Sequence, residues 1–478
     1  MSLKTKTIHG AVWSFVDNIA SSGITFLVGI ILARLLTPEE FGVLGMLTIF
    51  IAISNSFVDS GFSNALIRKN DVKAIDYNTV FYFNILIGIG CYIFLFIASP
   101  AISRFFREPQ LLNVTRVLGL VLIINALAII QRTQFIKKID FKTQAKISII
   151  SSLSSGSIGV GMAFAGCDVW SLVGQQLSRQ FFNTLFLWIY SKWRPAWEFS
   201  WKSFHEMFSF GSKLLVSGLL ETIYQNIYYL IIGRFYSSGL LGQYTRAEQF
   251  NTIFSSNLTS VVQRVSFPVL SSIQEEEQRL KEAYRRVMKM TMFVTFACML
   301  GLAATAKPLI LLLIGEKWLP AVAYLQIICF SGMLYPLHAI NLNILQVKGR
   351  SDIFLKLEII KKCIGVMPIV IGIFYGIEFM LLVGVIISMI AYFFNSYYSG
   401  RLINYSTWSQ IRDILPMFGV SLFVAICMWG LSFLDIPNML ILPLQCIVGI
   451  MLAIIIYKRI KLPEYFEIKE IVFSVIKQ

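Results

Sequence analysis

Charged residues are scarce in this sequence, and acidic residues are the scarcer kind. Only 14% of the 478 residues are Asp, Glu, Lys or Arg, against roughly 25% in an average soluble domain. In their place 56% of the residues are apolar, and the mean hydropathy is +0.71. This composition argues against an ordinary soluble enzyme and indicates a membrane protein, because runs of about 20 apolar residues span a bilayer.

Histidine and paired cysteine are also lacking. The chain has three His, far apart in sequence, and seven Cys without a C-x-x-C spacing. The pattern indicates neither a disulfide framework nor a metal site, and we expect no metal and no cofactor. Long outer loops are missing too. Because no catalytic constellation is visible either, we do not expect an enzyme, such as a glycan polymerase or ligase of the membrane.

The apolar runs predict an all-α polytopic membrane protein with about fourteen transmembrane helices. The first run is too long for a cleavable leader and lacks a small-residue cleavage site, so we expect it to be the first span. The predicted spans, numbered 1 to 14, cover residues 11–36, 41–64, 77–99, 112–133, 145–167, 168–190, 209–235, 243–268, 287–314, 319–346, 354–376, 378–401, 412–434 and 438–459.

The basic residues gather at one end of these spans. Of the 41 Lys and Arg, 32 lie at the ends on the side of the N-terminus and seven at the opposite ends, while Arg116 and Arg179 fall inside spans. The positive-inside rule therefore predicts that both termini are cytoplasmic. The net charge of +15 is then a topology signal and a contact with anionic membrane lipid, not a nucleic-acid surface.

Two segments 200 residues apart have similar sequences. Residues 30–44 read IILARLLTPEEFGVL and residues 230–244 read LIIGRFYSSGLLGQY, so Arg34 corresponds to Arg234 and Gly42 to Gly242. Each copy joins two apolar runs, as in transporters built from duplicated bundles. We expect two parallel six-helix repeats. The predicted domains are an N-lobe (1–190), a cytoplasmic linker (191–208), a C-lobe (209–401), and a C-terminal helix pair with a cytoplasmic tail (402–478).

Polar residues recur on one face of several spans, at steps of three and four. Such faces indicate a wet cavity or a helix–helix contact, because lipid-facing helices avoid polar groups. The repeated hairpins, spans 1–2 and 7–8, are among the most polar, so we expect them to line a central water-filled cavity; span 12 has a weaker stripe. The predicted substrate-binding residues are Asn18, Asn55, Gln176, Arg179, Gln180, Gln225, Arg246, Gln249, Asn251 and Arg264.

The intramembrane charges allow two interpretations each. Asp17, Asp59 and Glu221 are candidates for binding a coupling ion, either Na⁺ or H⁺. Alternatively, the two aspartates bond neighbouring Asn or Ser side chains, and Glu221 forms a structural pair with Arg179. Arg34 and Arg234 lie at outer helix ends, where they snorkel to headgroups or take part in transport.

Several motifs resemble a known family. They are ARLLTPEEFG (33–42), QFIKKIDFK (134–142), GQYTRAEQF (242–250), RVSFPVLSSIQ (264–274), GEKWLPAVAYLQI (315–327) and LNILQVKGRSDIFLK (342–356). Together they resemble the Wzx-like polysaccharide flippases, of O-antigen and colanic-acid type, in the multidrug/oligosaccharidyl-lipid/polysaccharide exporter superfamily. The resemblance covers nearly the whole chain.

The resemblance implies a fold and a substrate. It implies two lobes in a V plus two extra helices, and an undecaprenyl-diphosphate-linked oligosaccharide flipped across the bacterial cytoplasmic membrane by alternating access. Polysaccharide-assembly proteins are possible partners. Relatives place Arg deep in span 1, where this chain has Asp17, so Arg179, Arg246 and Arg264 are candidates rather than matches. The alternative function is a cation-coupled drug or small-molecule antiporter of the same superfamily.

Overall fold

The structure is a computed structural model that describes residues 3–69 and 71–476. The described residues form helices, turns and coil, without a strand. They divide into two compact units, Met1–Gly242 and Gln243–Gln478. The prediction of an all-α protein is confirmed.

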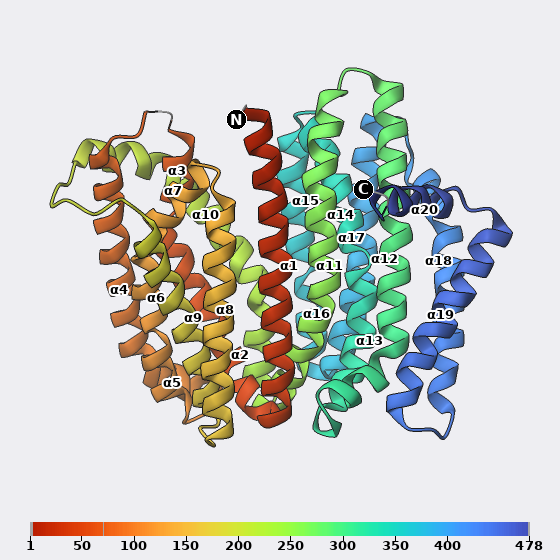
Figure 1. Ribbon diagram of the computed structural model, residues 1–478, viewed down its shortest axis with the longest axis horizontal. Coiled ribbons are helices and arrows are strands. Elements are labelled where there is room, and N and C mark those ends of the chain that lie inside the picture. Colours follow the sequence, from red (N-terminus) through yellow and green to blue (C-terminus); the bar gives the residue numbers. More distant parts are fainter. Residues whose placement is uncertain (1–2, 70, 477–478) are drawn as a thin grey trace. The chain divides into compact units, whose positions relative to one another are not determined.

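The first unit contains ten helices and the start of an eleventh (Figure 1). They are α1 (Leu3–Leu35), α2 (Pro38–Asp59), α3 (Phe62–Arg68), α4 (Ala74–Phe106), α5 (Leu111–Leu118), α6 (Leu120–Ala126), α7 (Ile129–Lys137), α8 (Phe141–Phe164), α9 (Val169–Tyr190), α10 (Trp201–Phe235) and the first residues of α11 (Ser238–Ser272).

The second unit contains the rest of α11 and nine further α-helices. They are α12 (Glu277–Leu313), α13 (Pro320–Gly332), α14 (Tyr335–Val347), α15 (Ser351–Ile364), α16 (Val366–Tyr375), α17 (Ile377–Leu402), α18 (Thr407–Gly430), α19 (Asn438–Ile460) and α20 (Pro463–Ile476). Two short 3₁₀ turns, Glu316–Trp318 and Leu431–Phe433, complete it.

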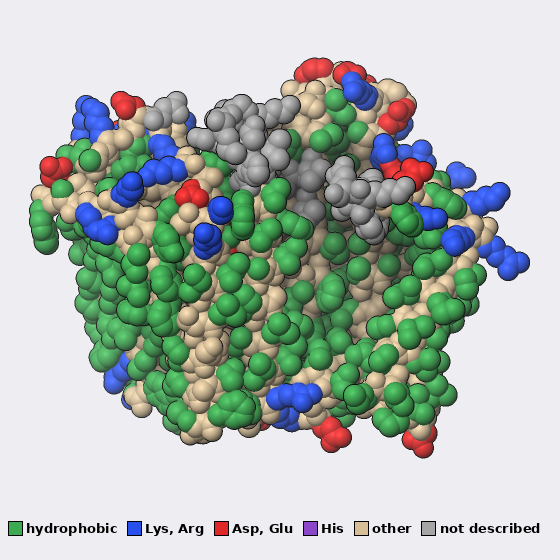
Figure 2. Space-filling model, viewed as in Figure 1, with side chains coloured by type: hydrophobic (Ala, Val, Ile, Leu, Met, Phe, Trp, Pro, Cys, Tyr) green, Lys and Arg blue, Asp and Glu red, His purple; other side chains and the backbone are tan. Residues whose placement is uncertain are grey.

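Each of the fourteen predicted spans coincides with one helix or with a run of short helices. Among the described residues, nine helical stretches are long and apolar enough to cross a membrane, and a tenth if the pair Leu111–Ala126 and Ile129–Lys137, bent by 41°, is one span. The protein is therefore a multi-pass membrane protein. In Figure 2, hydrophobic side chains cover the middle of the visible face, and most charged side chains lie toward its ends.

Breaks within the predicted spans have local causes. Span 2 becomes α2 and α3 because Ser60 and Gly61 adopt positive φ angles of 48° and 69°, which end a right-handed helix. The start of α2 is equally well defined. Pro38 occupies the first turn, and the Thr37 N–H donates to Glu40 Oε2 at 2.6 Å, which satisfies a backbone donor at the helix start.

The two sequence repeats meet inside the first unit. A Cβ added to Gly42 would lie 1.7 Å from the Ser238 carbonyl oxygen, and one added to Gly242 would lie 1.8 Å from the Pro38 carbonyl oxygen. Pro38 and Ser238 are themselves 200 positions apart, so the contact is reciprocal. The glycines recur because the starts of α2 and α11 approach each other backbone to backbone.

Helix α10 packs along this unit from end to end. Near its start, a buried cluster joins Phe62 of α3, Phe81 of α4, Ile130 of α7 and Met207 of α10. In its middle, the hydroxyl oxygens of Thr222 and Ser56 are 3.1 Å apart. The segment predicted as a linker, 191–208, divides into coil over 191–200 and the first turns of α10.

In the second unit, α20 lies across α12 rather than along it (Figure 1). Two ion pairs hold it there, Arg286 with Glu467 and Lys289 with Glu464. The preceding helices α18 and α19 also pack against α12. The predicted C-terminal helix pair therefore belongs to the body of this unit.

Candidate functional site

The first intramembrane carboxylate, Asp17 of α1, faces α8 and α9. Its Oδ1 accepts a hydrogen bond of 2.9 Å from Ser21, whose hydroxyl lies 3.3 Å from that of Ser148 on α8. Its charge also acts on Arg179 of α9. Asp17 therefore lies within electrostatic range of Arg179, the deepest predicted cation. Glu221 accepts a hydrogen bond of 2.9 Å from Gln225 of its own helix.

The second carboxylate, Asp59, has a cationic neighbour that we did not predict. Asp59 ends α2 and accepts a hydrogen bond from Ser63 of α3, and its charge acts on Arg132 of α7. We counted Arg132 only among the inner-end positive charges of span 4. Its proximity to Asp59 depends on how α7 packs against α3, which the local sequence does not encode.

An amide ladder crosses the first unit. The Gln180 side chain donates to Asn125 Oδ1 at 3.1 Å, and the Asn125 side chain donates to Asn55 Oδ1 at 2.9 Å. The ladder connects α9, α6 and α2. Two predicted residues, Asn55 and Gln180, are therefore joined through Asn125, which we did not predict because it stands alone in an apolar segment, LVLIINALAII.

The other predicted residues of this unit differ in exposure. Asn18 is half-buried on α1, whereas Gln176 on α9 and Gln225 on α10 are exposed. Side chains of this kind hydrogen-bond sugar hydroxyls when a polar ligand is present. Arg179 is half-buried and keeps its guanidinium in a partly desolvated setting, where bonds to phosphate oxygens are strong.

In the second unit, the predicted residues of α11 divide between half-buried and buried positions. Arg246 and Gln249 are half-buried. Asn251 is buried and lies against Gly332 of α13, where an added Cβ would sit 2.2 Å from Asn251 Oδ1. The side chain of Arg264 lies outside the described residues.

The weaker polar stripe of span 12 packs inside the second unit. His338 of α14 lies 3.0 Å from Ser388 Oγ through Nε2, and 3.1 Å from Asn395 Nδ2 through Nδ1. Close by, Asn341 Oδ1 accepts hydrogen bonds from Tyr284, at 2.9 Å, and from Ser399. These polar residues hydrogen-bond one another between α12, α14 and α17, as is typical of buried groups in a membrane protein. Asn395 Oδ1 is buried without a hydrogen-bond partner among the described residues.

Taken together, the first unit holds two Arg–Asp associations and an amide ladder. Such an interior offers hydrogen-bonding groups within a membrane span, and guanidinium groups have a donor geometry that suits phosphate oxygens. Hydrogen-bonding and charged groups inside membrane-spanning helices are typical of the binding site of a transporter.

A family model described as "Polysaccharide biosynthesis protein" matches residues 31–323, more than half of the chain. The chain belongs to this polysaccharide biosynthesis protein family. The family resemblance predicted from the motifs is therefore confirmed. The matched region contains most of the predicted residues, the second sequence repeat and all but the first residue of the first repeat.

Curated relatives match at low identity over most of their length. The teichuronic acid biosynthesis protein TuaB of Bacillus subtilis (strain 168) is 28% identical over 356 residues, covering 74% of this chain and 73% of TuaB. The lipopolysaccharide biosynthesis protein WzxC of Escherichia coli (strain K12) is 25% identical over 374 residues, covering 78% of this chain and 76% of WzxC.

Solved structures show the same fold. The inward closed conformation of the lipid II flippase MurJ aligns with a TM-score of 0.75 at 15% identity, covering 95% of this chain and 99% of MurJ. An inward-facing multidrug resistance transporter of the MATE family, in the MOP superfamily, aligns with a TM-score of 0.59 at 14% identity, covering 85% and 96%. The chain therefore has the fold of MOP-superfamily transporters.

Proposed function

We propose that the protein flips an undecaprenyl-diphosphate-linked oligosaccharide across the bacterial cytoplasmic membrane, for the synthesis of a surface polysaccharide such as lipopolysaccharide, capsule or exopolysaccharide. The observation that carries this proposal is the family match over residues 31–323. The names of WzxC, TuaB and a succinoglycan biosynthesis transport protein, ExoT of Rhizobium meliloti (strain 1021), favour polysaccharide transport over an enzymatic step.

In this proposal, the polar interior binds the headgroup while the prenyl chain stays in lipid. Asn18, Asn55, Gln176, Gln180, Gln225, Gln249 and Asn251 replace part of the hydration of the sugar. Arg179, Arg246 and Arg264 bind the diphosphate, because a guanidinium offers donors in a geometry that matches phosphate oxygens. Both termini are cytoplasmic, so the substrate enters from the cytoplasmic leaflet and leaves on the opposite side.

Alternating access supplies the movement. The lobes proposed to move are those of the sequence repeat, residues 1–190 and 209–401, with 402–478 as an accessory helix pair. Asp17, Asp59 and Glu221 are the proposed groups for Na⁺ or H⁺. One unit charge crossing 100 mV gains about 2.3 kcal/mol, which is enough to bias such a cycle.

Deletion of the gene tests the function directly. We expect lipid-linked oligosaccharide to accumulate on the inner leaflet, and the wild-type chain to restore its export. Cation-dependent dye efflux by purified protein in vesicles, without movement of the lipid-linked glycan, would instead establish the antiporter alternative.

Replacing Arg179 tests the proposed site. Arg179→Ala should reduce glycan export roughly 10- to 100-fold at unchanged protein level, because one charge-assisted hydrogen-bonded contact is worth about 1.5–3 kcal/mol. Arg279→Ala is the matched control, since Arg279 is exposed and pairs only with Glu276 of the same cytoplasmic connection among the described residues. Wild-type export by Arg179→Ala would remove Arg179 from the mechanism.

A further inference from the structure

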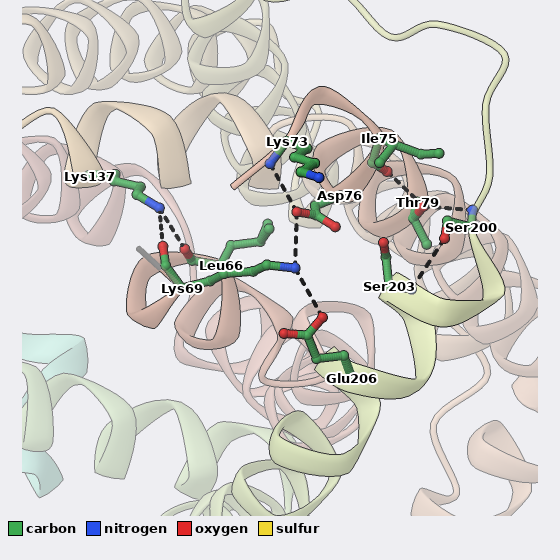
Figure 3. Close-up of polar contacts among 10 residues, drawn as sticks. All are labelled: Leu66, Lys69, Lys73, Ile75, Asp76, Thr79, Lys137, Ser200, Ser203 and Glu206. Atoms are coloured by element: carbon green, nitrogen blue, oxygen red, sulfur yellow. Dashed lines mark hydrogen bonds and ion pairs between the residues drawn. The ribbon is translucent and has the colours of Figure 1, made fainter. Parts of the chain in front are cut away.

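The coil between α9 and α10, residues 191–200, is fixed to α4 by its backbone. The Ala196 N–H donates to Asn78 Oδ1 at 3.2 Å, and the Ser200 N–H donates to Thr79 Oγ1 at 3.0 Å (Figure 3 shows the second bond). Both acceptors are buried in the first turns of α4. The coil is therefore an ordered part of the first unit, and Figure 1 shows it at the margin of that unit, beside α4.

The first turns of α10 are fixed in the same way. Lys69 Nζ lies 3.0 Å from Glu206 Oε2 of α10 and 3.2 Å from Asp76 Oδ2 of α4 (Figure 3). Burial would lower the pKa of Lys69, but its hydrogen bonds to Glu206 and Asp76 and their charges outweigh burial and raise it. Lys69 therefore stays charged, and the join between coil and helix is held in place.

This fixed segment presents aromatic side chains outward. Trp197 is 93% exposed, Trp201 is 68% exposed and Phe199 is 44% exposed. Trp197 stacks on Tyr82 with ring centroids 5.3 Å apart, which sets its orientation. Trp side chains exposed beside the end of a membrane span are typical of the membrane–water interface, where the ring is partly in apolar and partly in polar surroundings.

Basic residues accompany the aromatic ones. Lys192, Arg194 and Lys202 are exposed, and Glu198 is the single acidic residue in 191–202. Arg194 donates to the Ser191 and Trp193 carbonyl oxygens, and no acidic side chain pairs with it among the described residues. Insertion of the aromatic rings into the membrane does not account for this excess of positive charge. Electrostatic attraction to an anionic lipid headgroup does.

We propose that residues 191–202 form an aromatic–basic platform that binds anionic phospholipid headgroups of the cytoplasmic leaflet, and so fixes the depth of the α9–α10 join in the membrane. The side of the membrane rests on the topology in the proposed function. The proposed ligand is anionic phospholipid for two reasons. The exposed aromatic rings are favourable at the membrane–water interface, and the net positive charge attracts lipids of negative net charge.

Tryptophan fluorescence in proteoliposomes tests the platform. The full-length chain is reconstituted into vesicles containing brominated phosphatidylglycerol or, at equal mole fraction, brominated phosphatidylcholine, whose bromines quench nearby Trp. The chain has nine Trp, so the difference from a Trp197→Phe/Trp201→Phe variant isolates the two platform residues. We expect stronger quenching of this difference signal by the brominated anionic lipid.

The charge variant is Lys192→Gln/Lys202→Gln, at two exposed side chains for which no contact is described. Each basic residue near an anionic surface contributes about fivefold in affinity, so the preference for anionic lipid should fall by at least fivefold. Lys356→Gln/Lys458→Gln, at two exposed lysines of the second unit, is the matched control and should keep the preference.

Equal quenching by both lipids, no quenching by either, or a preference that survives the charge variant would each overturn the platform. The measurement needs no transport, so its failure is distinct from failure of the flippase function. Conversely, a chain that flips no glycan would still show the quenching pattern if the platform exists.

Discussion

Single glycines decide how closely the two repeated hairpins approach. Gly42 and Gly242 each face a backbone carbonyl of the other copy at a distance that leaves no space for a methyl group. A flexible side chain can move aside, but a helical backbone moves only with its whole helix. The repeat visible in the sequence is therefore a packing requirement as well as a sign of duplication.

Replacing either glycine with alanine should destabilise the protein. Overpacking typically costs about 1–3 kcal/mol, and contacts below 2 Å to backbone place Gly42→Ala and Gly242→Ala at or beyond the upper end. Thermal unfolding in detergent measures the effect. Gly218→Ala in α10 is the control, because open space surrounds it and alanine favours a helix. Equal stability of Gly42→Ala and Gly218→Ala would contradict the close approach.

At the same scale, the sequence predicted which residues are polar and intramembrane but not their partners. Asp17 and Arg179 were both predicted as functional, yet their association requires α1 and α9 to lie near one another. Arg132 was missed because a basic residue at an inner helix end already had a sufficient explanation in the positive-inside rule. His338 was missed as a partner of Asn395 because the two lie on separate helices.

At the scale of helices, a few interhelical hydrogen bonds hold elements together inside the membrane. The Asn55–Asn125–Gln180 ladder joins three helices of the first unit. Helix–helix contact in lipid gains little from hydrophobic burial, so such bonds and close packing take its place. The helices themselves were predictable from apolar runs, but the break at Ser60 and Gly61 was not, because the apolar run was predicted as one span over 41–64. The partners of each helix were not predictable either.

Removing the central residue of the ladder should lower the free energy of unfolding. Asn125→Leu deletes both bonds and should cost about 1–2 kcal/mol, because interhelical hydrogen bonds in membranes average roughly 0.6 kcal/mol and reach about 1.7 kcal/mol. Unfolding in mixed detergent micelles measures the loss. Asn226→Leu is the control, since the described bond of that amide is to Thr222 of its own helix, at 2.8 Å. If the ladder stabilises the fold, Asn55→Ala will lower the free energy of unfolding less in the Asn125→Leu background than in the wild type. Equal losses in the two backgrounds would contradict the ladder's contribution.

At the scale of the whole molecule, the distribution of charge predicts how the chain is oriented in the membrane. Exposed Glu316 lies in the turn before α13, and exposed Glu275 lies between α11 and α12. The positive-inside rule predicts that these positions are on opposite sides of the membrane. This prediction uses loop charges alone and needs no knowledge of how the helices pack.

Cysteine labelling tests this orientation. With the seven native Cys replaced by Ser, Glu316→Cys should react with a membrane-impermeant maleimide in intact spheroplasts. Glu275→Cys should react only after the membrane is permeabilised. The opposite pattern would invert the topology and with it the proposed direction of glycan movement.

Helix α11 begins in the first unit and continues in the second, because the division between the units falls at Gly242 and Gln243. The two units are thus connected at this point by a continuous rod of hydrogen-bonded backbone, not by a slack tether. A movement of one unit against the other at this boundary would bend or twist that rod, so the elastic stiffness of a single helix would oppose it.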